Sequence, residues 1–84
     1  MLAVAKKKPQ KGTNPVAVAF GQRLRAVREK AGLSLAEAAE VAGMAYSAFA
    51  RLERGEREPT ISTLQTLITA LGCTPADLIP ARSE

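Results

Sequence analysis

The fold of this 84-residue chain is decided by residues 34–55, which read SLAEAAEVAGMAYSAFARLERG. Ser34 and Glu37, three residues apart, form a capping-box signal that opens a helix over residues 35–42. Gly43 supplies the left-handed backbone angle that closes this helix. A second helix then runs over residues 46–53, so the stretch predicts two short helices joined by a tight turn.

The second of these helices has faces of different character. Phe49 and Leu52 point toward a core at helical spacing. The other faces carry Tyr46, Ser47, Ala50 and Arg51. One side therefore packs while the other is free to enter a DNA groove, which is the arrangement of a helix-turn-helix motif.

The residues before this stretch predict a longer helix over residues 15–31. Asn14 and Pro15 are a cap followed by a first-turn proline, and Gly32 stops the run. The apolar positions that recur at helical spacing are Val16, Phe20, Leu24, Val27 and Ala31.

The residues after it predict two further helices. Thr60 caps a fourth helix that Gly72 ends, and Thr74 with Pro75 starts a short fifth helix that ends before Pro80. The apolar face of the fourth helix consists of Ile61, Leu64, Leu67, Ile68 and Leu71. No strand signal occurs in the sequence, so the predicted fold class is all-α with five helices.

The flanks of the two short helices carry a family resemblance. Residues 20–34, FGQRLRAVREKAGLS, precede them, and residues 53–59, ERGEREP, follow them. Together with the leucines from Leu64 to Leu71, these segments resemble the lambda-repressor-like (Cro/xenobiotic-response-element) DNA-binding domain over about residues 15–79. The resemblance implies a five-helix domain over residues 14–80, with its helix-turn-helix at the second and third helices.

The resemblance also implies which side chains read the bases. In the family, residues at the start of the third helix and one turn later point at base edges, and these positions hold Tyr46, Ser47 and Arg51. Arginine can donate two parallel hydrogen bonds to guanine, serine can donate or accept, and a tyrosine ring suits a thymine methyl group. A solvated helix face is the alternative interpretation of these three residues.

Further residues take supporting roles under the same resemblance. Arg54 and Arg57, beyond the end of the third helix, are expected to contact phosphates, although Glu56 and Glu58 beside them oppose this. Arg28 and Glu53 occupy positions that the family pairs in a structural ion pair, which would orient the third helix.

Two positions depart from the family pattern. Leu35 stands where the family usually has a glutamine that binds a phosphate, so that contact is absent. Ala45 stands where a serine or threonine usually caps the third helix. If Ser47 instead capped a helix that starts later, Ser47 would not read bases.

The net positive charge of the chain comes from its first 13 residues. The chain has 12 basic and 8 acidic residues, and four of the basic ones are Lys6, Lys7, Lys8 and Lys11. The remainder is therefore formally neutral. We expect residues 1–13 to be a flexible basic arm whose lysines contact DNA phosphates, with a solubilising tail as the alternative, and residues 81–84 to be disordered.

Composition excludes several classes of protein. The chain has no histidine and one cysteine, so an internal disulfide is impossible, and neither a metal site nor a cofactor is expected. No apolar run is long enough to cross a membrane, and the start lacks the pattern of a secretory signal. We therefore expect a cytoplasmic, nucleoid-associated protein that is not an enzyme.

These observations predict a transcriptional regulator, a repressor or a controller, that binds a near-palindromic operator on double-stranded DNA as a homodimer. The expected dimer interface consists of Leu71, Cys73, Leu78 and Ile79. Cys73 also fits a small buried position. No effector domain is appended, so no small-molecule ligand is expected. The alternative is a protein-interaction module or antitoxin of the same fold, which the apolar Leu35, Ala45 and Tyr46 favour.

Overall fold

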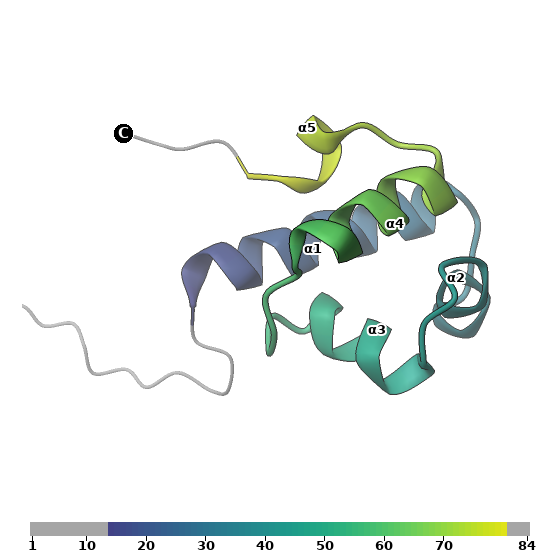
Figure 1. Ribbon diagram of the computed structural model, residues 1–84, viewed down its shortest axis with the longest axis horizontal. Coiled ribbons are helices and arrows are strands. Elements are labelled where there is room, and N and C mark those ends of the chain that lie inside the picture. Colours follow the sequence, from purple (N-terminus) through teal and green to yellow (C-terminus); the bar gives the residue numbers. More distant parts are fainter. Residues whose placement is uncertain (1–13, 81–84) are drawn as a thin grey trace, which may run out of the picture.

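The computed structural model describes residues 14–80, so the predictions for residues 1–13 and 81–84 lie outside the described range. Five helices follow one another along the chain (Figure 1): α1 Pro15–Lys30, α2 Leu35–Val41, α3 Tyr46–Glu53, α4 Ile61–Leu71 and α5 Pro75–Leu78. Residues 14–80 contain no strand. The predicted all-α fold is confirmed, α1 and α2 end one residue earlier than predicted, and α5 ends before Pro80 as predicted.

Local capping explains where the helices begin. The side-chain oxygen of Asn14 accepts hydrogen bonds from the backbone nitrogens of Val16 and Ala17 at 2.8 and 3.4 Å. Ser34 and Glu37 form the complete capping box, with bonds of 3.0 and 2.9 Å. These bonds satisfy amide groups that have no partner within the helix, so each start is fixed by the residue beside it.

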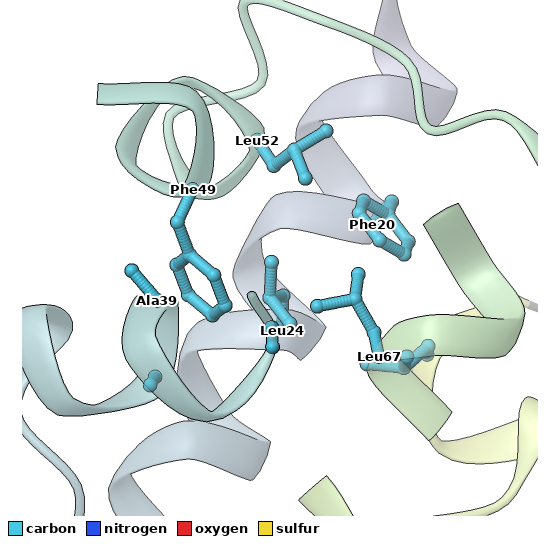
Figure 2. Close-up of a cluster of buried hydrophobic side chains, with 9 residues drawn as sticks. Phe20, Leu24, Ala39, Phe49, Leu52 and Leu67 are labelled. Carbon is cyan, nitrogen blue, oxygen red and sulfur yellow. The ribbon is translucent and has the colours of Figure 1, made fainter. Parts of the chain in front are cut away.

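The core is formed by large side chains from four helices and by alanines from α2. Leu24 of α1 lies between Phe49 of α3 and Leu67 of α4, with Phe20 and Leu52 beside them (Figure 2). The alanines are Ala38 and Ala39 of α2 and Ala42, the residue that caps its C-terminus. Because alanine side chains are short, the α2 backbone approaches its neighbours closely, and the two helices of the predicted motif form one packed unit.

Four residues lie on faces other than those predicted, and one of them is Ala31, which is exposed at the C-cap of α1. Ala50 is buried, because α3 packs against both α1 and α2 and therefore buries more than a single narrow stripe. Val16 and Ile61 are 63% and 75% exposed. They stand in the first turns of α1 and α4, where each helix extends beyond the core that its apolar face covers.

Candidate nucleic-acid interface

One face of α3 is open to solvent and carries the three residues predicted to contact bases. Tyr46 is 56% exposed, and Ser47 and Arg51 are also exposed. Ser47, Arg51 and Arg54 are spaced at i, i+4 and i+7, so they follow one line along the helix. The opposite side of α3 is fixed to the core through Phe49 and Leu52.

The start of α3 decides between the two roles open to Ser47. The helix begins at Tyr46, and Ala45 is its N-cap without a side-chain hydrogen bond. Ser47 therefore lies inside the first turn and is not the cap. Its hydroxyl remains on the exposed face.

An ion pair connects the end of α3 to α1, where the resemblance placed one. Arg28 Nε donates to Glu53 Oε2 at 2.5 Å, and Arg28 Nη2 donates to Glu53 Oε1 at 3.2 Å. The two side chains are only 13% and 9% exposed. The hydrogen bond to Glu53 raises the pKa of Arg28 above its ordinary value, although burial opposes this. The pair holds one end of α3 against α1.

Two glycines allow α1 to approach the end of α3 closely, a role that the sequence analysis did not assign to either of them. A Cβ on Gly21 would collide with the carbonyl oxygens of Leu52 and Glu53. A Cβ on Gly55, whose φ is +75°, would lie 2.8 Å from the Cα of Val18. No local pattern indicates this role, because the close approach joins segments that are far apart in the sequence.

The arginines in and just beyond the last turn of α3 differ in what they contact. Arg54 Nε donates to Glu56 Oε2 at 2.7 Å, and this hydrogen bond raises the pKa of Arg54. Arg51 and Arg57 are exposed, and neither has an ion-pair partner within residues 14–80. Around the end of α3, Arg51 and Arg57 are thus the cations that an external anion can reach without breaking an existing pair.

Two further predictions about DNA concern Leu35, where the family's phosphate contact is expected to be absent, and the lysines, which are expected to contact phosphates. Leu35 is half-buried and packs against the core, so it occupies the family's glutamine position with a structural side chain. Lys6, Lys7, Lys8 and Lys11 lie outside the described residues. The first described residue after that segment is Asn14, whose Nδ2 donates to Glu58 Oε2 in the turn between α3 and α4.

The structure divides the four residues predicted at a dimer interface. Leu78 is 0% exposed and belongs to the core, so its side chain is not available to a second copy, which corrects the prediction for this residue. The reason is that α5 docks on α1 and turns Leu78 inward. Leu71 and Cys73 are half-buried, and Ile79 is exposed. Ile61, which the periodicity assigned to the core, is the most exposed large apolar side chain in residues 14–80.

Metal sites and membrane-spanning helices are two other features to be considered in residues 14–80. No group of three or more histidine, cysteine, aspartate or glutamate side chains within residues 14–80 is arranged to hold a metal ion. Over the same residues, no helix has the length and apolar character needed to cross a bilayer.

Comparison with protein families gives one match that covers most of the chain. The family described as "Helix-turn-helix domain" matches residues 19–80, which includes all of α2, α3, α4 and α5. No protein with a curated description matches the chain.

Several solved structures are similar to the chain in sequence and in fold. The restriction-modification controller protein C.AhdI from Aeromonas hydrophila is 38% identical, with 75% of this chain and 96% of that chain covered, and a TM-score of 0.71. The master regulator for biofilm formation SinR, solved in complex with DNA, is 35% identical, with 70% and 95% covered and a TM-score of 0.66. The P22 c2 repressor, solved in complex with a synthetic operator, is 35% identical, with 71% and 91% covered and a TM-score of 0.65.

Proposed function

The chain belongs to the lambda-repressor-like helix-turn-helix family of DNA-binding transcriptional regulators, and from this premise we propose that it binds a specific near-palindromic operator as a homodimer, with α3 in the major groove. It would act in the cytoplasm as a repressor or controller. The similar structures support this proposal, because two of those proteins were solved on DNA.

The observation that carries the proposal is the exposed line of Ser47 and Arg51 on a helix whose other side is fixed. Arg51 has no ion-pair partner within residues 14–80, so its guanidinium is available for two parallel hydrogen bonds to a guanine. Tyr46 and Ser47 stand one turn earlier, within reach of the neighbouring base pairs. Because α3 is held to α1 at its far end, these side chains are presented in a fixed orientation.

Phosphate contacts would come from the region around the end of α3. Arg57 is available as it stands, whereas Arg54 has to exchange its bond to Glu56 for a phosphate. The lysines of residues 1–13 would add sequence-independent affinity, which suits a domain whose remaining charges balance.

A dimer would explain how a helix as short as α3 gives specific recognition of a DNA sequence. One helix contacts few base pairs, and a two-fold axis places two such helices in successive major grooves. We assign the interface to exposed apolar side chains, namely Ile79 from the predicted interface and Ile61 at the start of α4. Association would remove both from water, which is the driving force that an exposed isoleucine offers.

The oligomeric state is tested by sedimentation of the full chain at tens of micromolar. Ile61→Lys and Ile79→Lys should shift the protein toward monomer, because each would bury an unpaired ammonium group in the interface. Val41→Lys is the matched control, since Val41 is a half-exposed apolar residue on α2, outside the assigned surface. A monomeric wild-type protein, with and without DNA, contradicts the dimer.

The DNA-binding proposal is tested by selecting bound sequences from random duplex DNA with the purified full chain. An enriched palindrome supports a sequence-specific regulator. Arg51→Ala should abolish the enrichment at one position of each half-site, whereas Arg25→Ala, at an exposed position of α1, should leave the selected sequence unchanged. Failure to enrich any sequence at low salt overturns the proposal.

The second candidate is a protein-interaction module or antitoxin. Only Tyr46 and Ala45 still support it, because Leu35 packs against the core and adds nothing to an exposed apolar surface. The same selection experiment separates the two, since a module of this kind would enrich no DNA sequence.

A further inference from the structure

A pocket of about 450 Å³ lies on the side of the molecule formed by the ends of α1 and α4. Figure 1 shows α1 and α4 running in the same direction, with their last turns at the same end of the molecule. Lys30 and Ala31 at the end of α1 and Gly72 at the end of α4 line the pocket, and the chain then turns into α5, whose Asp77 closes one side. The volume falls within the range of about 300–1,000 Å³ that is common for small-molecule sites.

The floor of this pocket is apolar. Val27 and Ala31 contribute from α1, and Leu71 and Cys73 contribute from the end of α4 and the segment after it. Val27, Leu71 and Cys73 are half-buried and pack against the hydrophobic core. A ligand with a hydrocarbon or aromatic body would therefore remove further apolar surface from water.

The rim carries two cations that form no close ion pair within residues 14–80, although both attract the Asp77 carboxylate electrostatically. Arg23 and Lys30 both line the pocket from α1, two helical turns apart. Neither has an ion-pair or hydrogen-bond partner in residues 14–80, whereas Arg25 and Arg28 on the same helix both have one.

The one acidic group at the rim is already engaged. Asp77 Oδ2 accepts a hydrogen bond from the backbone nitrogen of Thr74 at 2.9 Å, as part of the cap of α5. This bond lowers the pKa of Asp77, so the carboxylate stays charged and the pocket as a whole carries one excess positive charge.

From the apolar floor and the two unpaired cations, we propose that this pocket binds a small amphipathic monoanion, such as a medium-chain or aromatic carboxylate. The anionic group would lie between Arg23 and Lys30, and the apolar body would rest on Val27 and Leu71. Asp77 would disfavour a ligand with a second negative charge. The sequence predicted no small-molecule ligand, and the site does not depend on the DNA-binding proposal.

The first test uses the full chain and the fluorescent probe 1-anilinonaphthalene-8-sulfonate, an aromatic monoanion. Decanoate should displace the probe, while decanol, which lacks the charge, should displace it at least about threefold less well. Arg23→Gln and Lys30→Gln should each weaken probe and decanoate binding by about threefold or more, and the double variant by about tenfold. Both residues are exposed, so the folded state should persist, as circular dichroism can verify.

The matched control is Arg25→Gln, which removes a cation of the same helix that does not line the pocket. Its affinity for decanoate should stay within about twofold of the wild-type value. Equal displacement by decanol and decanoate, or equal decreases in affinity for Arg25→Gln and Arg23→Gln, would overturn the proposal in favour of nonspecific binding to apolar surface.

The second test locates the ligand. Cys73 is the only cysteine of the chain, and it lines the pocket. Saturating decanoate should slow its alkylation by iodoacetamide at least about threefold, and Lys30→Gln should require more decanoate for the same protection. Unchanged alkylation overturns the site. If a second copy of the chain covers the pocket instead, Cys73 will be protected from alkylation without decanoate, and this protection will increase with protein concentration. That result also overturns the proposed ligand site.

Discussion

Arg28 connects Glu53, the last residue of α3, to the loop that precedes α2. Its Nε and Nη2 donate to the Glu53 carboxylate, and its Nη1 donates to the backbone oxygen of Leu33 at 3.0 Å. One side chain of α1 therefore fixes the end of the exposed helix and the entry to its partner helix together. The orientation of the proposed reading face depends on this contact.

Replacing Arg28 by methionine should lower the free energy of unfolding by about 2–4 kcal/mol, because it leaves the largely buried Glu53 carboxylate without its partner. Arg28→Lys should give an intermediate decrease in the free energy of unfolding. An ammonium group keeps the charge but cannot make the three hydrogen bonds of the guanidinium to Glu53 and Leu33. Urea denaturation measures both. Arg25→Met, which removes an exposed pair with Glu29, should change stability by less than about 0.5 kcal/mol. Equal effects of Arg28→Met and Arg25→Met would contradict a structural role for the buried pair.

Gly21→Ala should destabilise the protein by about 1–2 kcal/mol, even though alanine is the better helix former by about 1 kcal/mol. The added methyl group would collide with the carbonyl oxygens of Leu52 and Glu53, so α3 has to move away from α1. Thermal unfolding measures the stability, and affinity for the selected operator should fall as well. Gln22→Ala, at the exposed neighbouring position, is the control and should be near neutral. A more stable Gly21→Ala protein would show that the two helices are not held in close contact.

Arg51→Ala should weaken binding to the selected operator by about 1–3 kcal/mol while changing affinity for random duplex DNA little. The guanine hydrogen bonds exist only in the specific complex, so only that complex should weaken. Fluorescence anisotropy with both DNA duplexes at one salt concentration measures the difference. An equal decrease in affinity for both duplexes would make Arg51 a phosphate-binding residue.

Deleting residues 1–13 should leave the melting temperature unchanged, because Asn14 and its cap of α1 remain. Operator affinity should fall, because the deletion removes Lys6, Lys7, Lys8 and Lys11. The dependence of log affinity on log salt should become shallower by up to about 0.9 for each phosphate that one of these lysines neutralises. Titrations at several salt concentrations measure the slope. An unchanged affinity and slope would identify the segment as a solubilising tail.

The cap of α5 should make stability depend on acid pH. The hydrogen bond from Thr74 places the pKa of Asp77 in the folded protein below the value of about 3.9 expected when unfolded. The stabilisation from Asp77 is therefore complete at a pH above the pKa of the unfolded state. It is lost as the pH falls through the lower pKa of the folded state. The melting temperature of the wild-type protein should drop more between about pH 6 and about pH 2.5 than that of Asp77→Asn. Identical curves would show that this carboxylate does not stabilise the folded state.

The helices and their order followed from the sequence by itself. Where a helix starts depends on the residue next to it, as at Asn14, Ser34 and Thr60. Where a helix ends depends on glycines such as Gly72, whose φ is +68°. Such signals act over three or four residues, so they can be read before any packing is known. The line through Ser47 and Arg51 on one face of α3 could also be predicted from local helical spacing. Its role in reading bases came from the family resemblance.

Only the tertiary structure decided which apolar side chains are buried and which residues meet across the fold. Helical periodicity gives the direction of a face but not how far a neighbouring helix extends along it, so it placed Ile61 in the core and left Leu78 for an interface. The close approach at Gly21 and the pocket between Arg23 and Lys30 have no local signal either. Both arise from segments 30 or more residues apart, and only the packing of α3, α4 and α5 on α1 brings those segments together.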